Sequence, residues 1–183
     1  MCASTIASGQ WTFGDGTSGP LDEFNAGHHH YVADGTYQAG LTVVMRDGRT
    51  GSITQPVVVM THDVSAAKFD VPAKARTGQT KLVTLSVANT RYLESVTVDV
   101  SRDNGHGFVQ FGTLTLDVPA RATRTVQFPF AYTFTAADAL IGKVTFRAVV
   151  RLPFGVRDAR PQDNEVIAFS TTVLPSLTDL RFA

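Results

Sequence analysis

The chain has 183 residues, of which 43% are hydrophobic and 17% charged, with 16 basic and 16 acidic side chains. This is the composition of a folded globular protein with room for one large or two small domains. A net charge of zero argues against nucleic-acid binding, the single cysteine excludes an intrachain disulfide, and no apolar run is long enough to span a bilayer.

The first sixty residues contain the most informative motif. Trp11 and Phe13 lead into the turn Gly14-Asp15-Gly16, and alternation over residues 36–46 predicts a strand with one apolar face. The turn Asp47-Gly48 then predicts a hairpin. The motif continues in chain order with His29, Tyr31, Gly35 and Tyr37.

This order resembles the polycystic kidney disease (PKD) domain, an immunoglobulin-like sandwich. The resemblance implies that Trp11 packs in a core and that His29 and Tyr31 form the family's His-x-Tyr packing and hydrogen-bonding element. It also implies two or so strands before Trp11, whereas only ten residues precede it. We expect residues 1–61 to form a short PKD-like domain in which another chain supplies the missing pairing; the alternatives are a fragment or a fold that tolerates the loss.

The second segment, residues 62–174, is also patterned as strands. Apolar residues alternate over 96–100, 126–134 and 144–150, and the same habit is expected to continue through Ile167, Phe169, Thr171 and Val173. The order of Asn89 after one strand and Asp163-Asn164 near the end resembles the bacterial cell-adhesion-related (CARDB) domain, another immunoglobulin-like sandwich. The fold class predicted for the whole chain is therefore all-β, with two antiparallel immunoglobulin-like sandwiches in tandem.

Two shorter features lie in or after this second domain. Thr135 and Asp138 have the spacing of a helix capping box and predict one or two helical turns. Residues 175–183 are expected to form a tail, whose Leu177, Leu180 and Phe182 dock on their own domain or on a neighbour.

Two groups of residues have metal-ligating chemistry. Three adjacent histidines with Asp34 nearby could ligate Zn²⁺ or Ni²⁺, but neighbouring side chains on a strand point to opposite faces, which separates His29 from His28 and His30. The tract is therefore interpreted as structural, with His28, His30 and Asp34 kept as candidate ligands. A second group could bind Ca²⁺ and consists of Asp15, Asp22, Glu23 and Asp34. Turn formation is the simpler role for Asp15, and no cofactor is expected.

The sequence predicts a non-enzymatic protein with a structural or binding role, because it has neither a Gly-x-Ser-x-Gly elbow nor a phosphate-binding glycine loop. The two resemblances imply work at an extracellular or cell surface through protein–protein contacts, with other copies of the chain or a surface assembly as partner. One alternative is a capsid decoration protein at a virion surface. Another is a glycan-binding accessory module of a secreted hydrolase.

Overall fold

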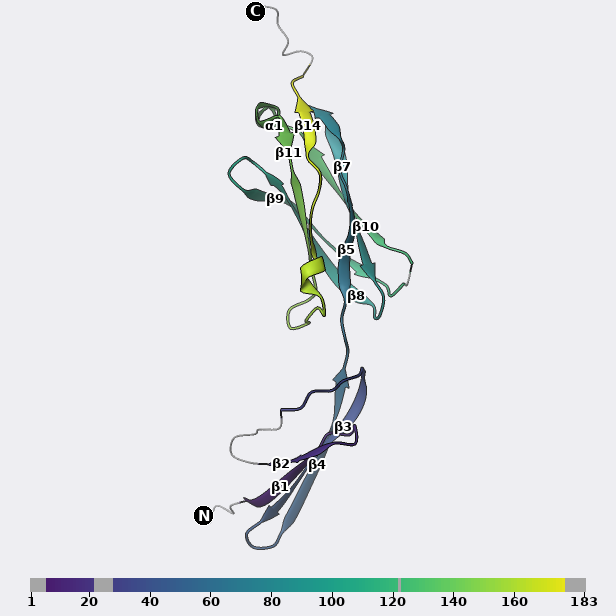
Figure 1. Cartoon of the computed structure of the whole chain (residues 1–183), viewed down its shortest axis with the longest axis vertical. Helices are drawn as coiled ribbons and strands as arrows, with labels where there is room; N and C mark the ends of the chain where they lie inside the picture. The colour runs from purple at the N-terminus through teal and green to yellow at the C-terminus, as the bar shows by residue number, and fades with distance from the viewer. Residues whose placement is uncertain (1–5, 22–27, 122, 177–183) are drawn as a thin grey trace, which may run out of the picture. The chain divides into compact units, whose positions relative to one another are not determined.

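The structure is a computed structural model and describes residues 6–21, 28–121 and 123–176. In this part of the chain nearly all regular structure is β-strand, which confirms the predicted all-β class. The chain divides into two compact units, Met1–Thr61 (unit 1) and His62–Ala183 (unit 2) (Figure 1). Asp22, Glu23 and the three apolar tail residues lie outside the described residues.

Unit 1 contains one antiparallel sheet in the order β2-β1-β3-β4. Its strands are β1 (Ile6–Thr12), β2 (Ser18–Pro20), β3 (Gly35–Met45) and β4 (Thr50–Val59). The predicted hairpin is confirmed at the β3–β4 connection, where the Gly48 amide donates to the Met45 carbonyl at 3.0 Å. Gly48 has φ of 82°, a left-handed conformation that suits glycine.

The two faces of this sheet differ in polarity. Trp11, Leu41 and Ile53 lie opposite one another on β1, β3 and β4, so their side chains share one face. Gln10 and Thr42 form the neighbouring pair and share the other face. The buried hydrophobic core residues of the described chain all lie in unit 2, so the apolar face of unit 1 has no second sheet over it among the described residues.

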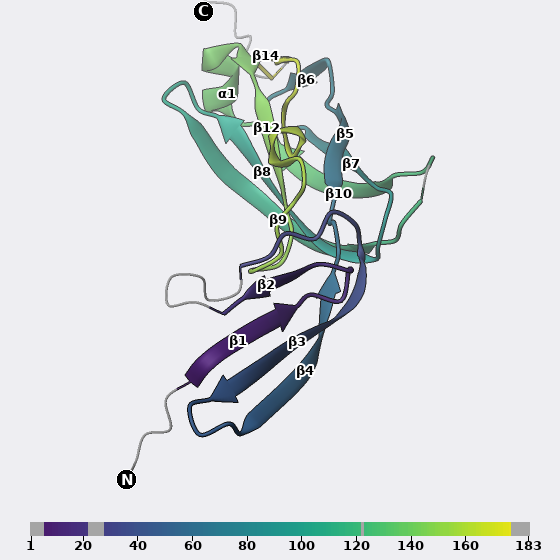
Figure 2. The ribbon, with the colours of Figure 1, turned by 60° about the horizontal axis from the view of Figure 1, so that its bottom comes forward.

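Unit 2 is a two-layer sandwich in which a sheet of order β10-β7-β5 faces one of order β13-β12-β8-β9 (Figure 2). In a smaller sheet, β11-β14-β6, the strand β14 pairs with β6 in parallel and with β11 in antiparallel orientation. The strands are β5 (Val64–Asp70), β6 (Lys74–Arg76), β7 (Thr80–Asn89), β8 (Glu94–Asp103), β9 (Phe108–Val118), β10 (Val126–Thr133), β11 (Lys143–Val144), β12 (Phe146–Arg151), β13 (Glu165–Ile167) and β14 (Thr171–Leu174).

The core of unit 2 follows the predicted alternation. Phe128, Phe130 and Tyr132 on β10 are all buried, as are the inward residues of β8 and β12. The rings of Phe134 and Phe146 pack edge-on against Tyr132 at 5.0 and 5.3 Å between centroids. The contact between Tyr132 of β10 and Phe146 of β12 joins the two layers.

The helix α1 (Ala136–Ile141) confirms the predicted capping box. Thr135 is its N-cap, the Asp138 amide donates to the Thr135 hydroxyl at 3.2 Å, and the Asp138 carboxylate accepts from the Thr135 amide at 2.8 Å. The Asp138 carboxylate is fully buried and pairs with Arg102 Nη1 at 3.0 Å. A helix of six residues thereby joins the two sheets through one acidic side chain.

The expected alternation through residues 167–173 is wrong in its first half. Ile167 and Phe169 are 55% and 95% exposed, whereas Thr171 and Val173 are buried. The chain pairs with β12 as far as Ile167 and then moves to the smaller sheet as β14. Because it changes sheets between these strands, the inward-facing parity restarts, and Val166 instead of Ile167 packs against the core.

Candidate functional site

Four rings of the first motif pack together in unit 1 as two stacked pairs that meet edge-on. The Phe13 and His29 rings are stacked at 4.0 Å, and the Tyr31 and Tyr37 rings at 4.2 Å. His29 meets Tyr31 edge-on at 4.6 Å, which links the two pairs. The Tyr31 hydroxyl also donates to the Phe13 carbonyl at 2.9 Å. The motif therefore holds the segment before β3 against the end of β1.

Asp15 is the polar centre of this motif. Its Oδ1 accepts from the Thr17 amide at 3.0 Å and the Thr17 hydroxyl at 2.6 Å, and its Oδ2 lies 2.7 Å from His29 Nε2. The Thr17 hydrogen bond, followed by the one from His29, lowers the pKa of Asp15 to about 2. Asp15 is thus an ionised turn residue whose acceptor oxygens are already engaged.

The glycines of the motif occupy positions that require glycine or that begin a strand. Gly14 and Gly16 have φ of 80° and 90°, and a Cβ on Gly14 would lie 2.6 Å from the Gln38 amide nitrogen. Gly14 therefore permits both the turn and the close approach of β3. Gly35 opens β3 opposite Val59.

The candidate metal ligands of unit 1 are dispersed. His28 and His30 are exposed on either side of the partly buried His29, and Asp34 Oδ1 accepts from the Thr61 hydroxyl at 2.6 Å. Within the described ranges, no histidine belongs to a group of three close potential ligands. Of the four carboxylates considered for Ca²⁺, two are described: Asp15 has its partner Thr17 in the same turn, and Asp34 has its partner Thr61 after β4.

A group of three carboxylates in unit 2 was missed by sequence reasoning. Oxygens of Asp63, Asp158 and Asp163 all lie within 4.8 Å of one another. Asp158 accepts from the Val64 amide at 3.1 Å and the Arg160 amide at 2.7 Å, whereas Asp163 Oδ1 is buried with no hydrogen-bond partner. Burial, followed by repulsion from Asp63 and Asp158, raises the pKa of Asp163.

These three carboxylates come from the segment before β5 and from the connection between β12 and β13, which lie nearly a hundred residues apart. No local spacing signals such a group, because the two segments meet only in the fold, through the bridge between His62 and Asp158 and the hydrogen bond from the Val64 amide to Asp158. Hard carboxylate oxygens are ligands that Ca²⁺ accepts. Among the described residues this group is therefore the one whose donor set could hold a divalent cation.

Asn89 and Asn164, the motif residues of unit 2, make hydrogen bonds that join backbone segments. Asn89 is 1% exposed, and its amide group donates to the carbonyls of Tyr92 and Val118, the latter at 2.7 Å. Asn164 ends the 3₁₀ turn η1 (Pro161–Asp163), and its carbonyl accepts from the Val150 amide at 2.8 Å. Asn89 thus joins the ends of β7 and β9, and Asn164 joins η1 to β12.

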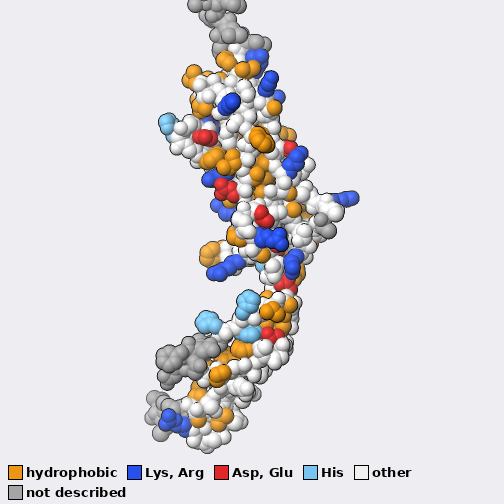
Figure 3. All heavy atoms as spheres, in the orientation of Figure 1, with side chains coloured by type: hydrophobic (Ala, Val, Ile, Leu, Met, Phe, Trp, Pro, Cys, Tyr) orange, Lys and Arg blue, Asp and Glu red, His pale blue; other side chains and the backbone are white. Residues whose placement is uncertain are grey.

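The apolar side of the unit 1 sheet carries two shallow hollows and is named the open face. It consists of Trp11, Ala39, Leu41, Val43, Ile53, Gln55 and Val57. One hollow of about 350 Å³ lies around Trp11 and Val57, and one of about 220 Å³ lies around Val43 and Gly51. Ile53 is 66% exposed, and Figure 3 shows hydrophobic side chains at the surface of this unit. Trp11 Nε1 has no hydrogen-bond partner among the described residues.

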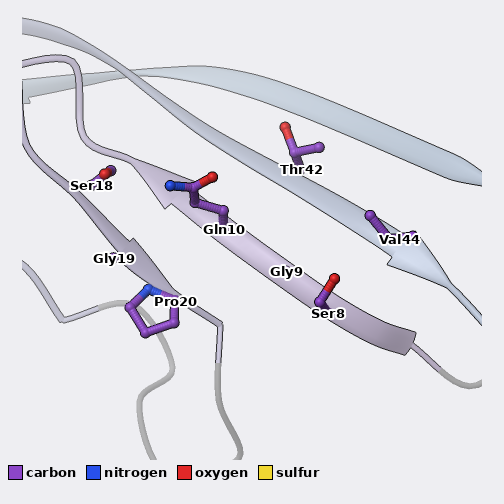
Figure 4. Close-up of a pocket in the computed structure, with 8 residues that line it drawn as sticks. All are labelled: Ser8, Gly9, Gln10, Ser18, Gly19, Pro20, Thr42 and Val44. Carbon is purple, nitrogen blue, oxygen red and sulfur yellow. The ribbon is translucent and has the colours of Figure 1, made fainter.

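The opposite side of the sheet carries polar side chains together with Pro20 and Val44. A hollow of about 460 Å³ lies over three strands, with Ser8 and Gln10 from β1, Ser18 from β2 and Thr42 from β3 (Figure 4). No charged side chain lines it. Phe13 stacks on His29, and Trp11 is partly buried.

Residues 3–61 match the family model of the PKD domain. Two solved structures from Pyrococcus furiosus are similar to the chain. A crystal structure of a CARDB domain in complex with di-metal ions has a TM-score of 0.52 and 16% identity, covering 66% of this chain and 100% of that chain. A solution NMR structure of the same domain has a TM-score of 0.51 and 15% identity, covering 63% and 98%.

These comparisons confirm the predicted order of a PKD domain and a sandwich with the CARDB fold. No curated protein matches the chain. Within the described ranges, no helix has the length and apolar character needed to cross a membrane.

Proposed function

We propose that this chain, a PKD domain followed by a CARDB-like immunoglobulin sandwich, is a non-enzymatic binding module that makes protein–protein contacts at an extracellular or cell surface. The observation that carries the proposal is the open face of unit 1. A sheet in a folded domain normally covers its apolar face with a second layer. Here that layer is not formed by the described residues, which makes the face suited to receive another protein.

The energetics favour covering this face. Complete burial of a leucine, isoleucine or valine side chain is worth about 1.5–3 kcal/mol. Leu41 and Val57 are only partly buried and Ile53 is mostly exposed, so each has apolar surface still in contact with water. A partner that covers several of these side chains would gain several kcal/mol before the cost of association.

The arrangement around Asp15 supports a role other than catalysis. A catalytic triad requires the nucleophile to bond to the histidine, which is then oriented by the acid. Here the Thr17 hydroxyl and the His29 ring both bind the same carboxylate of Asp15, so His29 is not placed to accept the proton of Thr17. These three residues therefore stabilise the turn, which agrees with the match to the PKD domain family.

Thiol labelling in native material tests the proposal. Cys2 is replaced by serine, and a cysteine is introduced by Ile53→Cys on the open face or by Thr54→Cys, the exposed neighbour on the other face. A maleimide reagent is applied to the purified dilute chain and to cells or particles that carry it. We expect Cys at position 53 to be protected only in native material while position 54 labels in both. Equal labelling of both positions in native material would contradict the proposal.

A further inference from the structure

We propose that Asn104 of unit 2 is a self-modification site, at which the backbone nitrogen of Gly105 displaces the side-chain amide as ammonia and leaves aspartate or isoaspartate. The site lies in the turn of residues 104–107, which joins β8 to β9. It involves neither the open face of unit 1 nor the three carboxylates of unit 2, so it goes beyond the proposed function.

The sequence contains one Asn-Gly pair, Asn104-Gly105. An asparagine side chain can react with the backbone nitrogen of the next residue, because the two are held together in one chain and close a five-membered ring. Glycine in the second position favours the attack, since it has no side chain to shield its nitrogen. Gly105 is exposed, and a Cβ at this position would have only Ile141 near it, at 4.0 Å. No side chain from another element therefore crowds the attacking nitrogen.

Two hydrogen bonds in the turn prepare the reacting groups. The Gly105 amide donates to Asp103 Oδ1 at 2.8 Å, so a carboxylate lies where the proton of the attacking nitrogen has to go. The His106 amide donates to Asn104 Oδ1 at 2.9 Å, which polarises the side-chain carbonyl and stabilises the negative charge that develops on its oxygen. The turn thus supplies both a base and an activated carbonyl.

The reaction balances without an oxidant or a reductant. The Gly105 nitrogen forms a bond to Asn104 Cγ and gives its proton to the Asp103 carboxylate. The bond from Cγ to Nδ2 then breaks, and the departing nitrogen takes up that proton and leaves as ammonia. Water adds to one of the two carbonyls of the resulting cyclic imide and opens it to aspartate or to isoaspartate. The net change is the gain of one water and the loss of one ammonia.

The other described asparagines are held away from this chemistry. Asn89 is 1% exposed and its side-chain amide donates to two backbone carbonyls, and Asn164 is 8% exposed. Thr90 and Glu165 follow them, and each has a side chain beside the nitrogen that would attack. We therefore expect the reaction to be selective for Asn104 in the folded chain.

Asp15 and Asp47 are also followed by glycine, but a carboxylate cyclises mainly in its protonated form. The hydrogen bond from Thr17, followed by the one from His29, lowers the pKa of Asp15 to about 2. The hydrogen bonds from Arg49 lower the pKa of Asp47. Both residues stay ionised at neutral pH, so they serve as controls within the same chain.

The products change both the charge and the geometry of the turn. The new acid lowers the net charge of the chain from zero by one and places a negative charge next to Asp103. Isoaspartate also adds a methylene group to the backbone between β8 and β9. At this point Asp103 pairs with Phe108, and Arg147 Cζ lies 4.8 Å from the centre of the Phe108 ring. We expect the two strands of the modified chain to pair less well at this end of the hairpin.

Peptide mapping by mass spectrometry tests this inference on the purified full chain, sampled over weeks at physiological temperature and neutral pH. The peptide with Asn104 should take on the mass of an acid and separate into two products, of which one matches the Asn104→Asp variant. Asp103→Ser keeps an oxygen that can accept from the Gly105 amide but removes the base, so it should convert several-fold more slowly. Asp117→Ser, which removes an exposed carboxylate elsewhere on β9, should convert like the parent chain. Circular dichroism checks that each variant is folded.

Three results would overturn the inference. The first is a folded chain that keeps the Asn104 amide over the period in which the same chain, unfolded in guanidinium, loses it. The second is conversion of Asn89 or Asn164 in the folded chain as fast as that of Asn104, which would remove the selectivity of the turn. The third is an equal rate for Asp103→Ser and the parent chain, which would remove the role of the Asp103 carboxylate as the base.

Discussion

Asp15 and His29 show how single residues set the structure of unit 1. The carboxylate accepts two hydrogen bonds from Thr17 and pairs with His29, whose ring stacks on Phe13. Sequence alone located these residues through the motif, because Gly-Asp-Gly turns and paired aromatics are local patterns. It could not show that Thr17 donates two hydrogen bonds to this carboxylate, since a threonine in a turn has no distinguishing pattern.

Acid titration should show how much the ionised Asp15 contributes to the stability of unit 1. Its pKa is about 2 in the folded state and 3.8 in the reference state, so its ionisation stabilises the fold above pH 4, and this contribution is lost as pH falls through 2. Asp15→Asn should lower the stability of unit 1 at neutral pH. It should also make that stability less dependent on pH between pH 4 and 2. Trp11 is the single tryptophan and reports on this unit by its emission. A variant whose curve follows that of the parent chain would exclude the ionic role.

At the scale of elements, the alternation of apolar residues predicted the strands that build the core of unit 2. β10 and β12 have strict parity because each lies within one sheet along its whole length. The same rule failed at Ile167 and Phe169, where the chain leaves one sheet and joins another. Alternate residues face the core only while a strand stays paired within one sheet. The sequence pattern therefore does not indicate where the chain moves from one sheet to another.

The helix α1 shows how one buried acid can hold two elements together. Asp138 caps the helix through Thr135, accepts from the Tyr132 hydroxyl at 2.8 Å and pairs with Arg102 of β8. Burial, followed by the bond to Asp138, raises the pKa of Tyr132, which therefore stays a neutral donor. The capping box was visible in the sequence as a spacing of three residues, but Arg102 was not, because the ion pair spans separate elements.

Removal of the Asp138 carboxylate should lower the free energy of unfolding of unit 2. Asp138→Ala leaves the partly buried Arg102 without its partner and should destabilise unit 2 by about 3–5 kcal/mol. Thr135→Ala, the matched control, loses only part of the helix cap and should cost about 1 kcal/mol. Denaturant unfolding followed by circular dichroism measures both values. Equal losses for the two variants would mean that the contact with Arg102 contributes nothing.

At the scale of the whole molecule, the two units differ in how they bury apolar surface. Unit 2 has a closed core between two sheets, whereas the described residues of unit 1 form one sheet with an open face. The sequence could not reveal the hollows of the open face, nor the three carboxylates of unit 2, because both depend on segments that meet only in the folded chain.

Hydrogen exchange of the dilute, purified chain tests most directly whether unit 1 is completed by a partner. Amides of a sheet with an uncovered apolar face open at lower free energy than those of a closed sandwich. We predict that β1, β3 and β4 exchange much faster than β7, β8 and β12 in the dilute chain, and that they become protected where the chain is assembled. A dilute monomer in which β1, β3 and β4 are as well protected as the core strands of unit 2 would contradict the account.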